Sequence, residues 1–272
     1  MSNPAFIKLF GERNTGTRAV AEMLRQLHGV TLRPPGSCRR SELDPTLAAA
    51  IRSKMQGRWA REYRHALRDE TDSNVPPLMM WKHACPVYDD EYVRMKAHVI
   101  MMVRDPYSWS MAMWRHPYHA KGPQHSTPEQ FLTYPWMTER RDGASRIYAS
   151  PVQLWSAKLA AYEKFVSQAE VNEVPVQYLH FRDFVPNPAS ALAEILKNFG
   201  IVANGLCALP NSFNEPDKSL AYVQSVYAGE SRALNISDEC IGAINHFVDW
   251  RLAARFGYSR ISERETGAAA AA

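Results

Sequence analysis

The sequence predicts an α/β protein with a parallel central sheet flanked by helices. Short apolar runs that stop at glycine or arginine alternate with longer stretches whose apolar residues recur at helical spacing. This alternation is typical of a parallel sheet with helices on both faces. The 272 residues can bury a large core. We expect one domain over residues 1–265, with inserted segments near 31–75 and 115–150, and a disordered tail over 266–272.

Two segments open the predicted fold. Residues 5–10 form a short, mostly apolar run that stops at Gly11, which indicates a buried strand. From Thr17 onward, apolar residues recur at helical spacing, so the pattern predicts strand, tight loop and helix. Residues 31–75 are polar and rich in arginine, with a helical pattern around residues 47–67.

The middle of the chain carries two further apolar runs. Residues 78–81 are interpreted as a second strand, which leads into Lys82 and His83. Residues 98–103 are the clearest strand pattern in the chain. Asp105 and Pro106 follow it, and aspartate before proline predicts the start of a helix.

The remaining elements continue the alternation. We interpret residues 115–150 as an inserted surface region because they are rich in His, Pro, Gly and aromatic residues. The pattern then predicts a helix over 153–166, a strand over 174–181, a helix over 189–199 and a last helix over 237–256.

Composition excludes several classes of protein. The net charge of +4 is a mild excess and the basic residues are scattered, so we do not expect a nucleic-acid-binding protein. The four cysteines form no CxxC pair, and we expect reduced thiols in a cytoplasmic protein without a zinc site or disulfides. We find neither a signal-peptide pattern nor an apolar run of membrane-spanning length, so no membrane insertion is expected.

The loop after the first predicted strand has the features of an anion site. Residues 11–18 have the glycine spacing of a P-loop, but Thr17 and Arg18 replace the Lys-Ser/Thr pair of nucleotide triphosphatases. Backbone N–H groups at a helix N-terminus can still bind an anion. Side-chain donors can come from Arg13, Thr15, Thr17 and Arg18. The alternative is an ordinary glycine turn with surface arginines.

This loop resembles that of the sulfotransferases that use 3′-phosphoadenosine 5′-phosphosulfate (PAPS). Their first loop typically reads Lys-Ser-Gly-Thr-Thr, and residues 14–18 take those places as Asn14-Thr15-Gly16-Thr17-Arg18. Asn14 stands where the family has its lysine, so the neighbouring Arg13 is the candidate for the missing charge. The loop, including Gly16, is therefore the candidate site for the phosphosulfate end of the donor.

Residues 99–106 resemble a second family segment. There, an arginine at a strand end and a serine on the next helix bind the 3′-phosphate of the donor. The resemblance assigns the arginine role to Arg104, while the family serine falls at Ala112. Ser108, one helical turn earlier, is the candidate replacement, with Ser110 as the second choice. The alternative for Arg104 is a surface ion pair with a carboxylate.

A third segment supports the resemblance without adding chemistry. Residues 176–184 and the helical pattern that ends near Phe199 and Gly200 are similar to the family's strand, acidic turn and helix. The matching segments run from about residue 5 to residue 201. Their order and spacing, more than any one of them, carry the resemblance.

The resemblance implies transfer of a sulfuryl group from PAPS to a hydroxyl or amine of a small-molecule or carbohydrate acceptor, without a metal. Lys82 falls where the family has a lysine near the sulfuryl group, and His83 is the candidate base. The small-molecule branch of the family has its histidine one position later, where this chain has Ala84. A structural histidine is the alternative. Other candidate bases are Glu12, Asp89, Asp90 and Glu91.

Several questions stay open at the level of sequence. Trp114, Tyr118, Tyr134, Trp136 and Tyr148 could line an acceptor pocket or pack in the core, and Lys218 could contact the nucleotide or be a solvated loop lysine. The oligomeric state is not predicted. Two other functions compete: a P-loop phosphotransferase, and a non-catalytic nucleotide-binding protein of the same fold.

Overall fold

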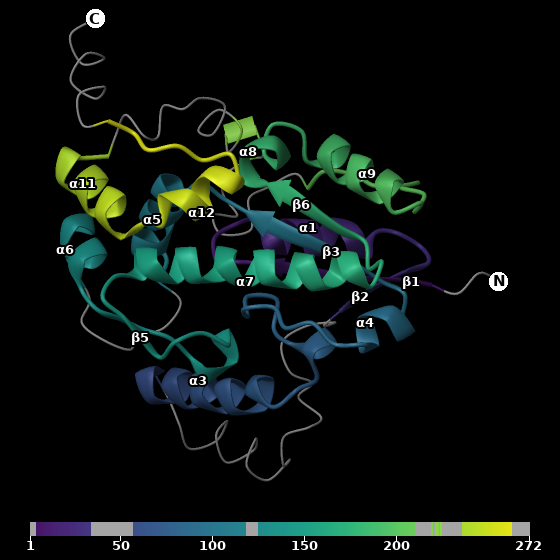
Figure 1. The fold of residues 1–272 in the computed structure, drawn as a ribbon, viewed down its shortest axis with the longest axis horizontal. Helices are drawn as coiled ribbons and strands as arrows, with labels where there is room; N and C mark the ends of the chain where they lie inside the picture. The colour runs from purple at the N-terminus through teal and green to yellow at the C-terminus, as the bar shows by residue number, and fades with distance from the viewer. Residues whose placement is uncertain are drawn as a thin grey trace, which may run out of the picture.

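A parallel four-stranded sheet lies at the centre of the molecule, in the strand order β2-β1-β3-β6 (Figure 1). The computed structural model describes residues 4–33, 57–117, 125–209, 219, 221–222, 224 and 236–262. The predicted α/β class is confirmed. The strands are β1 (Ala5–Gly11), β2 (Val30–Arg33), β3 (Ala97–Val103) and β6 (Val176–His180).

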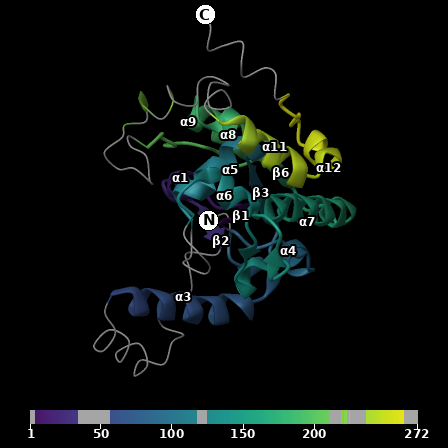
Figure 2. The same ribbon diagram turned by 90° about the vertical axis from the view of Figure 1, so that its left-hand side faces the viewer.

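Helices cover both faces of this sheet (Figures 1 and 2). Successive side chains of a strand point to opposite faces, so β1 and β3 each contribute to two cores. Phe10 and Met101 pack with α7 (Pro151–Val171), which crosses in front of the sheet in Figure 1. Leu9 and Met102 join the other core, behind the sheet. That core is formed with α1 (Thr17–Arg25) and α9 (Pro188–Asn198).

The predicted second strand over residues 78–81 is wrong. Pro77–Met79 form a single 3₁₀ turn, η2. These residues cannot pair with β1, because β1 already pairs with β2 on one side and with β3 on the other. β2 was not predicted, since it is four residues long and three of these residues fall within the polar segment 31–75.

The predicted last helix is two helices, α11 (Asp238–Phe247) and α12 (Trp250–Arg255). The break occurs because Val248 is extended and the Asp249 side chain accepts a hydrogen bond from the N–H of Leu252, which starts a new helix. The helix predicted at 47–67 is α3 (Gly57–Ser73) within the described residues; residues 47–56 lie outside them. Figure 1 shows α3 below α7, on the side away from the sheet.

The segment 115–150 is not simply a surface insertion. Its described part holds α6 (Pro128–Thr133), the hairpin of β4 (Trp136–Met137) and β5 (Ile147–Tyr148), and the 3₁₀ turn η3 (Arg140–Asp142). Thr138, Glu139 and Asp142 are fully buried in it. Three more helices complete the described elements: α4 (Glu91–Arg94), α5 (Pro106–Arg115) and α8 (Phe181–Phe184).

Cysteine, metal and membrane features can be stated for the described part of the chain. Cys85, Cys207 and Cys240 are free thiols, and Cys38 lies outside the described residues. Within the described ranges, no cluster of three or more His, Cys, Asp or Glu side chains could hold a metal ion. Among the same residues, no helix has both the length and the apolar character needed to span a membrane.

Candidate functional site

The loop between β1 and α1 turns tightly at the carboxyl edge of the sheet. A Cβ on Gly11 would lie 2.4 Å from Cγ2 of Thr17 and 2.9 Å from Cβ of Met102, so only glycine fits there. Asn14 and Gly16 have positive φ angles of 61° and 86°. The loop is thereby pressed against β3, and its backbone directs the chain into α1.

The N-terminus of α1 has no side-chain cap. Gly16 is its N-cap residue and has no side chain to offer. Six other described helices do have a side-chain cap, supplied by Asp105, Thr127, Ser150, Asn187, Ser237 and Asp249. The first N–H groups of a helix need acceptors, and the helix dipole favours a negative one. The start of α1 is therefore suited to an anionic ligand.

Arg104 joins the end of β3 to this loop. Its Nη1 donates a hydrogen bond to the carbonyl oxygen of Asn14 at 2.6 Å, and its Nε donates to Oγ of Ser108 at 2.9 Å. The guanidinium lies 4.2 Å from the centre of the Phe181 ring. The same ring is 3.4 Å from the place of a Cβ on Gly16. The structure thus brings Arg104, Ser108 and the α1 N-terminus to one place.

The environment of Arg104 argues against a surface arginine. Arg104 is only 3% exposed. Asp105, its neighbour, is the N-cap of α5: its carboxylate accepts hydrogen bonds from the N–H and the hydroxyl of Ser108. Ser110, the second candidate, is buried, and its Oγ has no hydrogen-bond partner among the described residues.

Asn14 and Arg13 are committed to other contacts. The Asn14 side chain donates to the carbonyl oxygens of Ala112 at 3.3 Å and His116 at 3.4 Å, in the last turn and at the C-cap of α5. The Arg13 guanidinium pairs with Oε2 of Glu139 at 3.2 Å and lies 4.1 Å from the Trp81 ring centre. The structure therefore directs both side chains toward neighbouring protein groups.

Lys82 and His83 lie at the end of β1, although they do not follow a strand. The N–H of Gly11 donates to the carbonyl oxygen of Lys82 at 2.9 Å, and Nδ1 of His83 lies 2.6 Å from the carbonyl oxygen of Gly11. A carbonyl oxygen only accepts, so Nδ1 must carry the hydrogen and Nε2 the lone pair. His83 is held in the tautomer that a base requires.

The charges around His83 keep its imidazole neutral. Burial lowers the pKa of His83 well below 6.5, and the positive charges of Lys82, Arg13 and Lys158 lower it further. The hydrogen bond to Gly11 opposes this shift only in part. At pH 7, the ring is therefore neutral.

Lys82 lies in a region of positive potential. It is partly buried, and burial lowers its pKa to about 8, aided by the charges of Arg18, Arg25 and Arg13. Arg18 is exposed. Crowding of like charges makes the ammonium form costly, and an anion bound nearby would relieve that cost. Lys82 and the α1 N-terminus together present positive charge at the carboxyl edge of the sheet.

The other candidate bases are placed differently. Glu12 is buried: its Oε1 accepts from the N–H of Arg13 at 2.7 Å, and its Oε2 lies 3.4 Å from Nζ of Lys158 on α7. Burial is the main reason that the pKa of Glu12 is raised. Asp89, Asp90 and Glu91 lie in or beside α4, which precedes the amino end of β3, at the opposite edge of the sheet.

A buried charged cluster beside the site was not predicted. The Trp81 ring lies against the guanidinium groups of Arg13 and Arg141, the latter 3.8 Å from the ring centre. It also contacts the His83 ring edge-on, with 4.8 Å between the ring centres. Glu139 accepts from both arginines. The same cluster includes Asp72, Asp142 and Lys158. These residues come from segments of the chain that are far apart in sequence, so spacing carries no signal for the cluster.

The aromatic residues divide between core and surface. Trp136 is buried and contacts Phe131 edge-on at 5.6 Å between ring centres, which favours core packing over a pocket. Trp114 and Tyr148 also pack against the core. Tyr134 is exposed. Tyr118 and Lys218 lie outside the described residues.

Comparisons with known proteins return structural likenesses only. No family model matches the sequence, and no curated protein matches it. A sulfotransferase domain from the curacin biosynthetic pathway resembles the structure with a TM-score of 0.45 and 11% identity, over 96% of this chain and all of that one. Mouse sulfotransferase SULT7A1 complexed with PAP resembles it with a TM-score of 0.40 and 14% identity, over 94% of this chain and 83% of that one.

Proposed function

We propose that this protein transfers a sulfuryl group from PAPS to a hydroxyl or amine of a small-molecule or carbohydrate acceptor. One observation carries the proposal, namely that Arg104 and the first loop lie together. The Arg104 guanidinium donates a hydrogen bond to the carbonyl oxygen of Asn14, and it lies against the same Phe181 ring that Gly16 approaches. Two strand ends therefore offer positive groups to one ligand. A nucleotide with anionic groups at both its 3′ and 5′ positions matches that arrangement.

The residues divide into two binding regions in this proposal. The N–H groups at the start of α1, with Thr15, Thr17 and Arg18 from the loop, would bind the phosphosulfate. Arg104 would bind the 3′-phosphate, since arginine forms strong charge-assisted hydrogen bonds with phosphate, and the Ser108 hydroxyl would turn from Asp105 to the phosphate. Because the Asn14 and Arg13 side chains contact protein groups, Lys82 is the best-placed cation for the sulfuryl oxygens.

His83 would act as the base. Its Nε2 takes the proton of the acceptor hydroxyl or amine while the acceptor atom forms a bond to sulfur. The bond between sulfur and the phosphate oxygen of PAPS breaks, and 3′-phosphoadenosine 5′-phosphate (PAP) leaves. Alignment of these groups and stabilisation of the charge on the sulfuryl oxygens are the main demands of such a reaction. Lys82, the loop N–H groups and His83 can meet them.

The competing phosphotransferase hypothesis has less support. In that class, a lysine follows the second glycine of the loop and reaches the terminal phosphates, and a Ser or Thr comes next to bind magnesium. Here Thr17 and Arg18 hold those positions. A requirement for magnesium would favour that hypothesis over ours. Tight binding of PAP without turnover of any acceptor would favour a non-catalytic protein.

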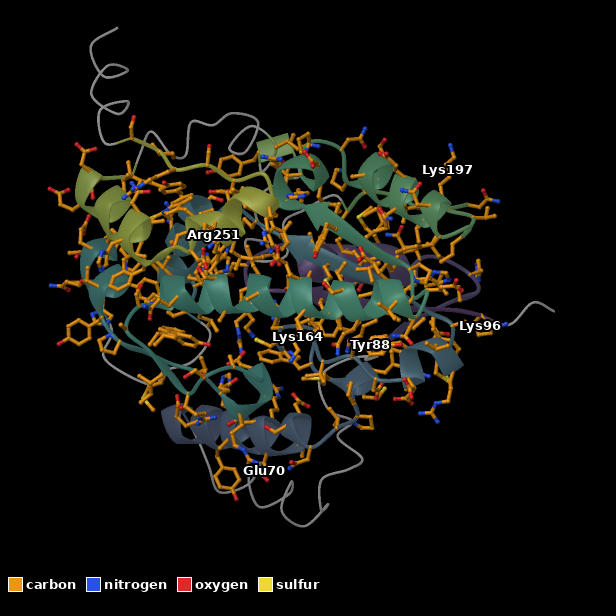
Figure 3. The ribbon with its side chains drawn as sticks, viewed as in Figure 1. Glu70, Tyr88, Lys96, Lys164, Lys197 and Arg251 are labelled. Atoms are coloured by element: carbon orange, nitrogen blue, oxygen red, sulfur yellow. The ribbon has the colours of Figure 1, made fainter. Side chains whose placement is uncertain are left out.

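Calorimetry with nucleotides tests the donor directly. We expect PAP to bind at least about tenfold more tightly than ADP, because only PAP has a phosphate for Arg104. Arg104→Ala removes a charged hydrogen-bonding group worth about 1.5–3 kcal/mol, so the PAP preference should fall by about tenfold or more. Arg251→Ala is the matched control, since this exposed arginine lies on α12 (Figure 3). Equal affinities for PAP and ADP in the unaltered protein would contradict the proposal.

A further inference from the structure

Lys158 is a buried lysine at which three segments of the site meet. It is 1% exposed and comes from the middle of α7. Its Nζ lies 3.4 Å from Oε2 of Glu12 in the first loop, and 3.4 Å from Oδ1 of Asp142 in η3. Its Nζ also donates a hydrogen bond to the carbonyl oxygen of His83. One ammonium thus links the first loop, the predicted base and η3.

The ammonium is stabilised where it lies. Burial by itself lowers the pKa of Lys158, but the negative charges of Glu12 and Asp142 outweigh burial and raise the pKa above its usual value. Lys158 therefore keeps its positive charge throughout the physiological range. A permanently charged donor is a firm anchor for the His83 carbonyl group.

We propose that Lys158 is a positioning residue for His83: it fixes the backbone of His83 and sets the charge around the imidazole, an inference that rests on the proposed function. The imidazole is held by the Gly11 carbonyl oxygen through Nδ1, and the His83 carbonyl oxygen is held by Lys158. The imidazole is therefore bound to the first loop directly, and the backbone of His83 is bound to it through Lys158 and Glu12.

A second buried lysine shows what is particular to Lys158. Lys8 on β1 donates to the carbonyl oxygens of Leu78, at 2.9 Å, and Met80. It fixes the chain ahead of Lys82, and the described contacts of its Nζ do not include His83. Lys8 therefore anchors the segment, while Lys158 anchors the base itself.

The charge of Lys158 also reaches the His83 ring. Lys82, Arg13 and Lys158 all lower the pKa of His83, and the Gly11 carbonyl raises it. Replacement of Lys158 by methionine removes one positive charge and leaves Glu12 and Asp142 without it. Both changes favour the imidazolium, so the pKa of His83 must rise. Among the described residues, the groups that face Lys158 or His83 from the surrounding elements are Glu12, Arg13, Lys82, Cys85, Asp142 and Tyr148, and Tyr162 faces Glu12.

Histidine NMR tests the inference without turnover. In the apo protein, ¹⁵N spectra report the tautomer and pKa of His83, and His83→Gln identifies its signals. We expect the Nδ1–H tautomer in the unaltered protein. In Lys158→Met, the pKa of His83 should rise by about one unit. Lys158→Arg keeps the charge and should leave the pKa near that of the unaltered protein. Lys164→Met is the control, an exposed lysine on the same helix (Figure 3).

Loss of one partner from a buried ion pair destabilises a protein, so Lys158→Met requires a safeguard. The double variant Lys158→Met/Glu12→Gln also removes the Glu12 carboxylate, which would otherwise be buried without its cation. Asp142 still lacks its partner there, so the pKa of His83 should again rise. An unchanged His83 pKa and tautomer in a folded Lys158→Met or double variant would overturn the inference.

Turnover separates this inference from the proposed function. With an acceptor that the unaltered protein sulfates, kcat should fall by about tenfold or more in Lys158→Met, while PAP affinity changes less than about twofold. The acidic limb of the pH profile of kcat should move to higher pH, because the pKa of His83 rises. A parallel loss of PAP affinity and kcat would show a structural role only. If the unaltered protein transfers no sulfuryl group but the NMR result holds, the proposed function fails and the positioning of His83 by Lys158 stands.

Discussion

His83 and Lys82 show how single residues acquire their chemistry from their surroundings. Both are held by the backbone of Gly11, and both have a lowered pKa because burial and nearby cations disfavour an added positive charge. For His83 this favours a neutral ring with a free lone pair. For Lys82 it gives a charge that depends on pH near the physiological range.

His83→Ala should reduce kcat by about a hundredfold or more, because general base catalysis contributes about that much. PAP affinity should be retained, since the ring is not assigned to the donor. Steady-state kinetics and calorimetry measure the two effects. His246→Ala, at an exposed histidine of α11, is the control. Unaltered turnover in His83→Ala would remove His83 from the mechanism.

The charge of Lys82 predicts a pH dependence of donor binding. Its pKa of about 8 means that the free protein loses this charge as pH rises from 7 to 9.5. PAP itself changes little there, because the second phosphate pKa is about 6. PAP should therefore bind about tenfold more weakly at pH 9.5 than at pH 7, while Lys82→Arg should bind it equally at both, since arginine does not titrate there.

The control for this titration is Lys197→Met, at an exposed lysine on α9 (Figure 3). It should follow the unaltered protein across the whole pH range. An identical pH profile in Lys82→Arg and the unaltered protein would show that Lys82 is not the group whose charge the donor senses.

Local sequence could predict which residues lie at the sheet edge but not which charges lie behind them. Lys82, His83, Arg104 and Ser108 follow short apolar runs, and in the structure they lie around the first loop. The partners of Arg13 and Glu12 could not be found in this way. Glu139 and Lys158 are more than a hundred residues distant from them, and only the packing of η3 and α7 brings them close.

At the scale of elements, the junction of β1 and α1 determines the shape of the proposed anion site. Gly11 and Gly16 allow the loop to approach β3 and Phe181. The apolar run at residues 78–81 shows a limit of sequence patterns, because such a run is equally compatible with a buried strand and with a buried irregular segment. In the structure, Pro77–Met79 form a 3₁₀ turn and do not join the sheet.

Gly11→Ala should disturb this junction. The new Cβ would lie 2.4 Å from Cγ2 of Thr17, so the loop must move, and we expect a loss of about 1–3 kcal/mol in unfolding free energy together with weaker PAP binding. Denaturant titration and calorimetry measure these quantities. Gly29→Ala is the control: its φ of +78° strains an alanine by roughly 1–2 kcal/mol, but no atom of the described residues lies within 4 Å of the new Cβ. PAP affinity that falls equally in both variants would contradict the assignment of the loop.

At the scale of the whole molecule, a buried ionic cluster fastens α3 and η3 to the sheet. Glu139 forms ion pairs with Arg13 of the first loop and Arg141 of η3. Arg141 also pairs with Asp72 of α3. Burial would raise the pKa of Glu139, but His65, Arg141 and Arg13 outweigh it and lower the pKa to about 2. The cluster connects α3 and η3 to the first loop, which is part of the proposed site.

This pKa predicts how stability changes in acid. A carboxylate with a lowered folded-state pKa stabilises the protein fully above its unfolded value near 4.5, and that contribution is lost as pH falls toward 2. Glu139→Gln should be less stable at pH 7 by about 3–5 kcal/mol. Its Tm should then decline less than that of the unaltered protein between pH 5 and pH 2.

Glu70→Gln provides the control for acid stability, because Glu70 pairs with Arg140 at the surface of α3 (Figure 3). Exposed pairs contribute little, so its Tm should follow that of the unaltered protein at every pH. Parallel Tm curves for Glu139→Gln and the unaltered protein would show that the cluster does not control stability in acid.

A crystal structure with PAP tests the central claim most directly, namely that two strand ends bind the two anionic groups of one nucleotide. We expect the 5′-phosphate at the N–H groups that start α1, near Lys82, and the 3′-phosphate within hydrogen-bonding distance of Arg104 and Ser108. A nucleotide bound elsewhere, or with its 3′-phosphate directed away from Arg104, would contradict it.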